Sequence, residues 1–419
     1  MPDKTFTASL FSKELPPGWK VVPAGAVLAS TQYGLSEPGD AEGNIPIVGM
    51  KDIANGIVNL DNLAMIDGGA DDWANFQLRR GDILLNRTNS PDLVGKVGIV
   101  LSDTQAVFAS YLVRLNPNST CIEPEFLNYW LNSPIAQRAL KRLSTRGVSQ
   151  ANINPTEFQK HCPVPLPPLD EQRKIADILR SWDEAIEKLK GLRGTKSDQL
   201  IGLTQRLIGR GGDLPNRWEL RPLSAISTRI TRQNSGGDHP VMTISAKTGF
   251  LMQSDKFSRD MAGRSVERYT LLRKGEFAYN KGNSQTAPYG CIFRLDRQTA
   301  LVPFVYFCFL LQEALNHEFY THLFAAGALN HQLSRLINSG VRNDGLLNLY
   351  AHDFFSCKVP VPPADKQEKI ASALTAAKRE IALLDSEIEA LSLQKRGLMQ
   401  KLLTGEWRVS TENYREAAE

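Results

Sequence analysis

Pro167-Pro168-Leu169-Asp170-Glu171-Gln172-Arg173-Lys174-Ile175 occurs a second time, 195 residues later, as Pro362-Pro363-Ala364-Asp365-Lys366-Gln367-Glu368-Lys369-Ile370. Each copy opens a long segment with regularly spaced apolar residues. A period close to half of the chain is too long for a solenoid repeat. We therefore expect two homologous units in tandem, and a function that needs two similar tools held at a fixed separation.

The duplication extends along both halves of the chain as collinear matching pairs, whose offset drifts only between 193 and 199 residues. Loop insertions and deletions would produce such a drift. The pairs are Leu78–Asp82 with Leu272–Glu276, Asn86–Ser90 with Asn280–Ser284, Pro46 with Pro240, Gly147-Val148 with Gly340-Val341, Cys162 with Cys357, and Leu15-Pro16 plus Trp19 with Leu214-Pro215 plus Trp218.

The bulk composition is that of an ordinary globular protein. A length of 419 residues is enough for two to four domains, each with its own core. No apolar run approaches the roughly 20 residues that span a bilayer, and no secretion signal is visible at the N-terminus. The five cysteines form no C-x-x-C pair, which favours reduced thiols over a disulfide or zinc framework. We therefore expect a cytoplasmic protein without membrane contact.

Charge is segregated along the chain, although the net charge is only +4. Residues 221–300 carry 13 Lys and Arg against 6 Asp and Glu, a local excess of 13 − 6 = +7. The stretch between Glu37 and Asp72 is acidic. A basic surface for a polyanion exists if folding gathers the basic residues on one face.

The two long segments are expected to be coiled-coil helices. Their apolar seams alternate spacings of four and three, and all ten seam positions in one segment lie 195 residues from those in the other. A period of 3.5 residues over about five heptads is typical of a coiled coil. The positions are Ile175, Leu179, Trp182, Ile186, Leu189, Arg193, Lys196, Leu200, Leu203 and Leu207 in the first, and Ile370, Leu374, Ala377, Ile381, Leu384, Ile388, Leu391, Lys395, Leu398 and Leu402 in the second.

Each seam needs a partner, and the simplest is the other helix in antiparallel orientation, forming a rod of about 50–57 Å. Asp170 and Asp365 are expected to cap the helix starts. Gly191 and Gly194 predict a local bend or break in the first helix, because glycine costs about 1 kcal/mol in a helix. Arg193 and Lys196 occupy seam positions there and are expected to extend outward.

The rest of the chain predicts an α+β fold, with two tandem mixed domains and a pseudo-two-fold internal repeat. In each half, short strands (Ile45–Val48, Asp82–Leu85 and Val97–Val100; Pro240–Ile244, Gly275–Tyr279 and Cys291–Leu295) precede a helix near Glu125–Leu143 or Val305–Leu323. We expect a first domain over 1–167, a central helix over 168–210, a second domain over 211–362, a C-terminal helix over 363–408 and a tail over 409–419.

Catalysis by this chain alone is not expected. No Asn/Asp-Pro-Pro-aromatic loop of an adenine methyltransferase is present, and no Gly-rich cofactor loop follows a strand. Gly191–Ser197 has the wrong spacing for a phosphate-binding loop. His317, His322 and His331 are too irregularly spaced for a zinc site, so we expect neither metal site nor catalytic residue.

Two variable domains that each end in Pro-x-Pro-Pro-x-x-[Glu/Lys]-Gln-x-x-Ile and lead into a long helix resemble the specificity subunit of type I restriction–modification systems. The resemblance covers nearly the whole chain. It implies a non-catalytic subunit that binds double-stranded DNA, with one half of a split target read by each domain. It also implies that the helices set the gap and dock two modification subunits. S-adenosylmethionine, ATP and Mg²⁺ would then belong to partner subunits, the last two to a restriction and translocation subunit. Ala364 and Lys366 depart from Leu169 and Glu171, so docking at the second helix start is expected to differ slightly.

A reader of half-sites needs cations that position phosphates and side chains that pair with base edges. The repeated Asn-x-x-Asn-Ser loops and the basic positions before them could supply both, and a basic strip follows on the first unit's helix. Turn capping or a solvated turn explains the same residues without DNA. The candidates are Arg79, Arg80, Asn86, Arg87, Asn89, Ser90, Arg138, Lys141, Arg142, Arg146, Lys247, Arg273, Lys274, Asn280, Lys281, Asn283 and Ser284.

The candidate residues for helix pairing and partner docking are Ile175, Leu179, Trp182, Ile186, Leu189, Ile370, Leu374, Ile381, Leu384 and Ile388. Half-sites are expected on one side of the duplex about 34 Å apart. Because the domains diverge outside their shared anchors, we expect an asymmetric target. The alternatives are a coiled-coil scaffold with protein-binding ends, a specificity module of a related modification–cleavage system, and a stand-alone enzyme.

Overall fold

The computed structural model describes residues 15–36, 43–68, 73–147, 150–209, 218–234, 236–256, 263–282, 285–337 and 346–410. The chain divides into two compact units. Unit 1 comprises Met1–Leu189 and Glu387–Glu419, and unit 2 comprises Lys190–Ser386. Each unit therefore contains one globular part together with about half of each long helix. The domain boundaries expected from sequence, which treat the helices as separate parts, stay a prediction.

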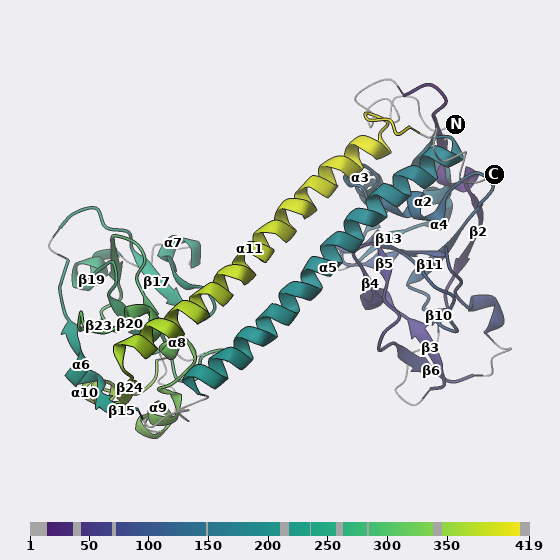
Figure 1. The fold of residues 1–419 in the computed structure, drawn as a ribbon. Helices are drawn as coiled ribbons and strands as arrows, with labels where there is room; N and C mark the ends of the chain where they lie inside the picture. The colour runs from purple at the N-terminus through teal and green to yellow at the C-terminus, as the bar shows by residue number, and fades with distance from the viewer. Residues whose placement is uncertain are drawn as a thin grey trace. The chain divides into compact units, whose positions relative to one another are not determined.

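The globular part of unit 1 is a mixed fold built around a six-stranded sheet in the order β2-β11-β7-β9-β5-β4 (Figure 1). Smaller sheets pair β1 with β14, β10 with β3 and β6, and β12 with β13 and β8. The strands are β1 Lys20–Pro23, β2 Leu28–Tyr33, β3 Ile45–Val48, β4 Ile53–Ala54, β5 Ile57–Val58, β6 Ala64–Ile66, β7 Ile83–Asn86, β8 Thr88–Asn89, β9 Val97–Ile99, β10 Val107–Phe108, β11 Leu112–Pro117, β12 Ser144–Arg146, β13 Ala151–Ile153 and β14 Pro163–Leu166.

Helices α2 (Pro124–Leu131), α3 (Pro134–Leu143) and α4 (Pro155–His161) complete this part. Trp130 on α2 is fully buried and its indole Nε1 donates to the Pro163 carbonyl at 2.7 Å. The sequence predicted one helix over Glu125–Leu143, whereas the structure has two. The break occurs because Ser133 caps α3, accepting from Ala136 N at 3.2 Å, and Pro134 cannot continue α2.

The globular part of unit 2 contains a four-stranded sheet in the order β16-β23-β20-β21 and three two-stranded pairs, β15-β24, β17-β18 and β19-β22. Its strands are β15 Glu219–Pro222, β16 Ser227–Ile230, β17 Met242–Ser245, β18 Gly249–Met252, β19 Thr270–Arg273, β20 Phe277–Asn280, β21 Cys291–Arg294, β22 Thr299–Val302, β23 Phe307–Leu311 and β24 Lys358–Val361. Its short helices are α6 Leu223–Ile226, α7 Gln253–Lys256, α8 His317–Ala325, α9 Asn330–Leu336 and α10 Ala351–Ser356.

The helix expected over Val305–Leu323 is partly wrong, since Phe307–Leu311 forms β23 and the helix starts at His317. β23 lies between β16 and β20, and four of its five residues are buried. A short, fully buried apolar run has no periodicity that separates a central strand from a buried helix. The equivalent strand of unit 1 is β11, 195 residues earlier.

The two sheets share one strand order, which makes the duplication visible in three dimensions. β2-β11-β7-β9 in unit 1 corresponds to β16-β23-β20-β21 in unit 2, and all of these pairs are antiparallel. The first and last strands of each globular part also pair, β1 with β14 and β15 with β24. The expected α+β class with an internal repeat and long antiparallel helices is thus confirmed.

The long helices are α5 (Leu169–Ile208) and α11 (Ala364–Leu403), each 40 residues long. Their bounds lie 195 residues apart at both ends. Each is followed by a glycine with positive φ, Gly209 (φ 93°) and Gly405 (φ 72°), a conformation that ends helices readily. Asp170 and Asp365 lie inside the first turn, so the expectation that they cap the helices was wrong.

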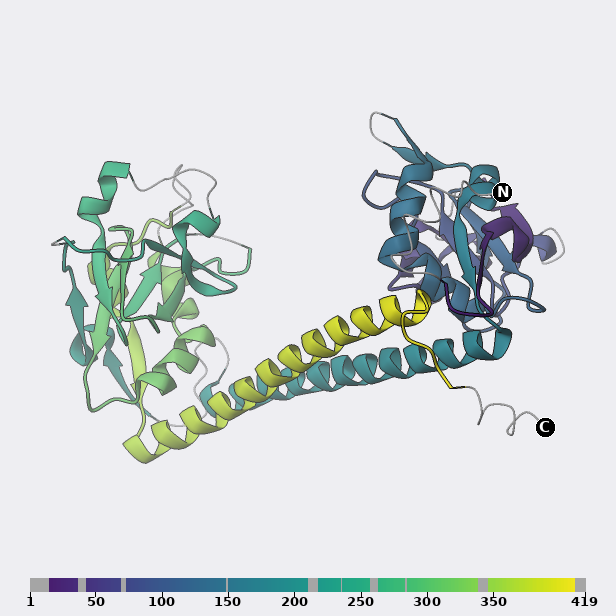
Figure 2. The ribbon, with the colours of Figure 1, turned by 90° about the horizontal axis from the view of Figure 1, so that it is seen from above.

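Within each unit the two helix segments run antiparallel, side by side (Figures 1 and 2). In unit 1, Met399, Leu402 and Leu403 of α11 share a core with Ile175 and Leu179 of α5. In unit 2, Ile370 and Leu374 of α11 share a core with Leu200, Leu203 and Leu207 of α5. Antiparallel packing is what these two sets require, because the start of one helix meets the end of the other.

The predicted bend or break at Gly191–Gly194 was wrong, because α5 is a continuous helix through both glycines. Nothing lies within 4 Å of a Cβ built at either position. The basic seam residues nearby form ion pairs across the helices of unit 2: Arg193 Nε lies 3.0 Å from Asp385 and Lys196 Nζ lies 2.8 Å from Glu380. Charge pairing with α11 thus supports the segment that lacks apolar seam residues.

Candidate nucleic-acid interface and helix junctions

The repeated Leu-x-x-Gly-[Asp/Glu] motif forms a turn held by its acidic residue. The Asp82 carboxylate accepts from Arg79 N at 2.9 Å and pairs with Arg114 at 3.4 Å. Glu276 accepts from Arg273 N at 2.7 Å and pairs with Arg232 at 3.1 Å. Both acids are buried, and burial raises the pKa of Asp82 in spite of Arg114. The acidic position is therefore structural, and a guanidinium from a different strand serves it in each unit.

The basic residues of these turns are exposed. Arg79 and Arg80 in unit 1, and Arg273 and Lys274 in unit 2, extend into solvent next to the buried acid. In unit 1 they border a cavity of about 400 Å³ together with Arg114. Their exposure is compatible with phosphate contact and equally with a solvated turn, so their role in DNA binding stays a prediction.

Asn86, the first residue of the Asn-Arg-Thr-Asn-Ser loop, does not reach the surface. Its side chain is 0% exposed, and neither amide atom has a hydrogen-bond partner among the residues that the structure describes. Direct DNA contact by Asn86 is therefore corrected in this conformation. Arg87 is tied down by bonds to the Ser110 carbonyl at 3.2 Å and to Asn152 at 3.1 Å.

Asn89 and Ser90 are half-buried, and the Asn89 side chain accepts from Ser90 N at 2.8 Å. Much of this loop therefore organises its own turn. A base contact by Asn89 would require it to exchange that bond. The DNA contact predicted for this pair is not tested by the geometry.

The equivalent loop of unit 2 is also built from local bonds. Asn280 Nδ2 donates to the Ile244 carbonyl at 3.1 Å, and its Oδ1 accepts from Gly282 N at 2.9 Å. The Lys281 ammonium lies over the Phe307 ring at 5.5 Å. Asn283 and Ser284 lie outside the described residues. Lys247 is exposed in the turn between β17 and β18.

The strongest exposed basic feature of unit 1 is the last part of α3. Arg138, Lys141 and Arg142 project from one face, while Ala136 and Leu140 bury the other face in the core. Cations in the last turn also interact favourably with the helix dipole. The side chain of Arg146, which follows in β12, lies outside the described part of the chain.

Gln172 and Gln367 fasten the long helices to the globular parts. Gln172 Nε2 donates to the Pro167 carbonyl at 2.9 Å and the Cys121 carbonyl at 3.0 Å, and its Oε1 accepts from Glu123 N at 2.8 Å. Gln367 donates to the Pro362 carbonyl at 2.8 Å and accepts from Asn316 N at 2.9 Å. Both side chains are buried. This explains why glutamine stands at this position in both copies of the motif.

Glu171 belongs to an ion pair that closes unit 1. Its carboxylate accepts from Trp19 Nε1 at 3.0 Å and from Arg408 Nε and Nη2 at 2.6 and 2.9 Å. Arg408 also donates to the Pro17 carbonyl at 3.3 Å. Glu171 is 2% exposed, so the charge is buried and doubly paired. A segment beyond α11 is thereby joined to the start of α5.

The predicted pairing residues mostly face the helix partner or the domain. Buried positions are Ile175, Leu179, Ile186, Ile370, Leu374 and Leu384, and half-buried ones are Trp182, Leu189, Ile381 and Ile388. In unit 1, Lys395 of the second seam pairs with Asp183, which also accepts from the Tyr129 hydroxyl at 2.9 Å. These contacts concern helix pairing; docking of another subunit on these residues stays a prediction.

His322 sits at the equivalent junction of unit 2, buried on α8, with Nε2 2.9 Å from the Thr375 hydroxyl of α11. Burial, with the nearby Lys378, lowers the pKa of His322 to about 4. An unfolded histidine titrates near 6.5. Between those values the unfolded chain binds the proton and the folded chain does not, so stability is full above about pH 6.5 and falls as pH drops toward 4.

We expect unit 2 to lose about 2 kcal/mol of stability between pH 6.5 and pH 5 from this group, and His322→Gln to remove that pH dependence. Urea unfolding at both pH values, with hydrogen exchange of α8 as the local readout, measures it. His352→Gln is the control, because that side chain is 79% exposed. A pH dependence that survives His322→Gln unchanged would contradict the assignment.

The sequence gave no weight to Trp19, Arg408 and Gln172 as functional partners, although the structure joins them at the start of α5. A signal was present for two of them: Trp19 recurs as Trp218, and Gln172 as Gln367. Arg408 could not be found in this way, because its contact depends on the chain fold. In the described residues no group of three or more His, Cys, Asp or Glu could hold a metal ion. No helix among them is long and apolar enough to cross a membrane.

Comparison with known proteins agrees with this architecture. Residues 18–193 match the family model described as type I restriction modification DNA specificity domain. The chain is 25% identical over 431 residues to the proposed MjaX type I restriction enzyme specificity subunit of Methanocaldococcus jannaschii, covering 95% of this chain and 96% of that protein. It is 29% identical over 202 residues to the EcoBI specificity subunit of Escherichia coli, covering 46% and 41%.

Among solved structures, the type I restriction–modification S subunit from M. genitalium has the same fold, with a TM-score of 0.58 at 16% identity, over 94% of this chain and 98% of that one. The match spans both units, whereas the family model covers unit 1 and the start of the helices. The duplicated domains, the paired helix halves and these similarities agree, and the chain belongs to the family of type I restriction–modification specificity subunits.

Proposed function

We propose that this chain is the non-catalytic DNA-recognition subunit of a type I restriction–modification complex and reads a bipartite, asymmetric target. The observation that carries the proposal is the duplicated globular part with one strand order, attached in each unit to a pair of antiparallel helix segments. One domain would read each half-site. Sequence divergence between two otherwise equivalent domains supports two different half-sequences.

The same architecture supports a docking role for the helices. Two modification subunits, which bring S-adenosylmethionine, would bind along α5 and α11, and a restriction and translocation subunit would bring ATP and Mg²⁺. The outer helix faces carry exposed apolar side chains, including Leu383 and Leu393, that intramolecular packing does not cover. Exposed apolar residues on a paired helix support a further protein contact.

The ruler role of the helices is tested by inserting seven residues into each helix, after Leu189 in α5 and after Ser386 in α11. Seven residues keep the 3.5-residue seam in phase and add about 10 Å, close to three base pairs. In cells that contain the modification subunits, we expect the methylome to show unchanged half-sites separated by a gap about three base pairs longer.

The unmodified chain provides the reference methylome for this experiment. An asymmetric target is expected for it, and a palindromic target would argue against divergent half-site readers. An unchanged gap after insertion would argue against the ruler role alone. Sequence-selective duplex binding with the modification subunit also separates the proposal from a protein-binding coiled-coil scaffold.

A further inference from the structure

We propose that the start of α11 carries a docking pocket for an acidic segment of a partner protein, and that the start of α5 lacks one because the chain fills the equivalent position itself. The inference rests on the proposed function for the identity of the partner, a modification subunit. The pocket and the filled position are each formed within one unit.

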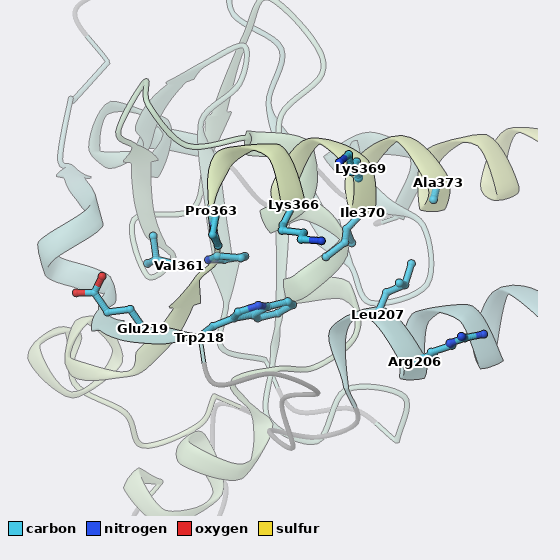
Figure 3. A pocket seen from close by; sticks show the side chains of 11 residues that line it. Arg206, Leu207, Trp218, Glu219, Val361, Pro363, Lys366, Lys369, Ile370 and Ala373 are labelled. Atoms are coloured by element: carbon cyan, nitrogen blue, oxygen red, sulfur yellow. The ribbon is translucent and has the colours of Figure 1, made fainter.

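The pocket has a volume of about 890 Å³ and lies where α5 ends and α11 begins (Figure 3). Its apolar surface comes from the Trp218 indole together with Leu207 and Ile370. Lys366 extends from the first turn of α11 on the side that faces Trp218, and Arg206 comes from the last turn of α5 (Figure 3). An apolar floor with basic groups at its rim suits a segment that carries both a carboxylate and an apolar side chain.

Unit 1 shows what occupies the equivalent position there. Trp19 corresponds to Trp218, and Glu171 to Lys366. The chain beyond α11 packs on this site: a Cβ at Gly405 would lie 2.5 Å from Pro16, and Arg408 binds the Glu171 carboxylate at 2.6 Å. A protein segment with a charged side chain therefore fills the first site, with its charge opposite to that of the helix residue.

The charge at this position is reversed in unit 2. Lys366 replaces Glu171, and Arg206 stands where unit 1 has Lys401. Both Arg206 and Lys366 are exposed and have no ion-pair partner among the residues that the structure describes. Lys369, the third cation, is 73% exposed and lies 3.7 Å from Asp365. The complement of this rim is a carboxylate, as a guanidinium is the complement of Glu171.

A protein segment fits this pocket better than a nucleic acid. The occupant seen in unit 1 is polypeptide, and it contacts proline and tryptophan as well as the charged residue. Phosphate backbones are bound through cations and polar groups without such an apolar floor. Acidic side chains at an interface also raise association rates toward a basic pocket.

The first test is carbodiimide cross-linking of the full chain with its purified modification subunit, because the reagent joins a lysine amine directly to a touching carboxylate. We expect peptide mapping to show Lys366 linked to an Asp or Glu of the modification subunit, and this link to disappear in Lys366→Arg. A link from Lys366 to Asp213, or to any acid of this chain, would overturn the proposal. A complex that forms without any link at Lys366 would overturn it too.

The second test measures affinity. We expect Arg206→Glu/Lys366→Glu to weaken binding of one modification subunit at least about tenfold at low salt, so that native mass spectrometry shows complexes with one such subunit instead of two. Lys366→Arg should bind normally. Arg379→Glu, an exposed charge reversal on α11 outside the pocket, is the matched control. Equal loss in Arg379→Glu, or no loss in the double variant, would overturn the pocket role.

These results are separable from the proposed function. Sequence-selective DNA binding is measured on the same preparations, with circular dichroism to check folding. A mapped Lys366 link in a complex without sequence selectivity would remove the DNA-recognition proposal and keep the pocket. Selective DNA binding with no contribution from Lys366 would do the reverse.

Discussion

Gln172→Ala is expected to destabilise unit 1 by about 3 kcal/mol. The variant loses bonds to Pro167 O, Cys121 O and Glu123 N, and the side chain that makes them is fully buried. Leaving a buried donor or acceptor without its bond costs about 1–3 kcal/mol for each group, and some of the three will regain water. The loss should also free the start of α5 from the loop before α2, so faster hydrogen exchange is expected at Glu123.

Urea unfolding, with hydrogen exchange as the local readout, measures this effect. Gln199→Ala is the matched control, because Gln199 is exposed on the same helix. Gln367→Ala should cost less than Gln172→Ala, since Gln367 makes two of these bonds and not three. Similar stabilities for the Gln172 and Gln199 variants would show that the glutamine does not fasten the helix.

The second large effect is expected in DNA binding. Arg138→Gln/Lys141→Gln removes two exposed charges from α3 while its buried face, with Ala136 and Leu140, stays intact. If both cations contact phosphates, affinity should fall about tenfold or more at low salt, and the slope of log K against log salt should decrease by about 2. Phosphate contacts carry no base information, so the loss should be the same for specific and non-specific duplexes.

Fluorescence anisotropy with the assembled complex, at several salt concentrations, is the measurement. Lys188→Gln/Lys190→Gln on α5 removes the same charge from a different surface and serves as the control. A loss confined to the specific duplex would indicate base readout by Arg138 or Lys141. An unchanged salt slope would mean that this strip lies away from the DNA.

Features repeated in the sequence were predictable, because duplication acts as an internal control. The offset of 195 residues placed both long helices, and the strands at Ile83–Asn86 and Phe277–Asn280 were expected from alternating and apolar patterns. Local pattern failed where tertiary context decides. Phe307–Leu311 reads equally well as helix or strand, and only its place between β16 and β20 settles the choice.

The candidate site was less predictable. Repetition marks a residue as needed in both units, and it does not say whether the need is structural or functional. Asp82, Asn86 and Gln172 all recur, and all three are buried. Exposed residues such as Arg138 need not recur if each domain binds a different sequence. The glycines of α5 misled because pairing with Asp385 and Glu380 on α11 offsets their low helix propensity.

The composition of unit 1 has a consequence for biosynthesis. Its core takes Met399, Leu402 and Leu403 from α11, and its buried Glu171 is neutralised by Arg408. Unit 2 draws only on the continuous stretch from Lys190 to Ser386. As the chain emerges from the ribosome, the first globular part must wait with an incomplete core and an unpaired carboxylate while the second is still being made. The part of the chain that is synthesised first is therefore the part whose folding finishes last.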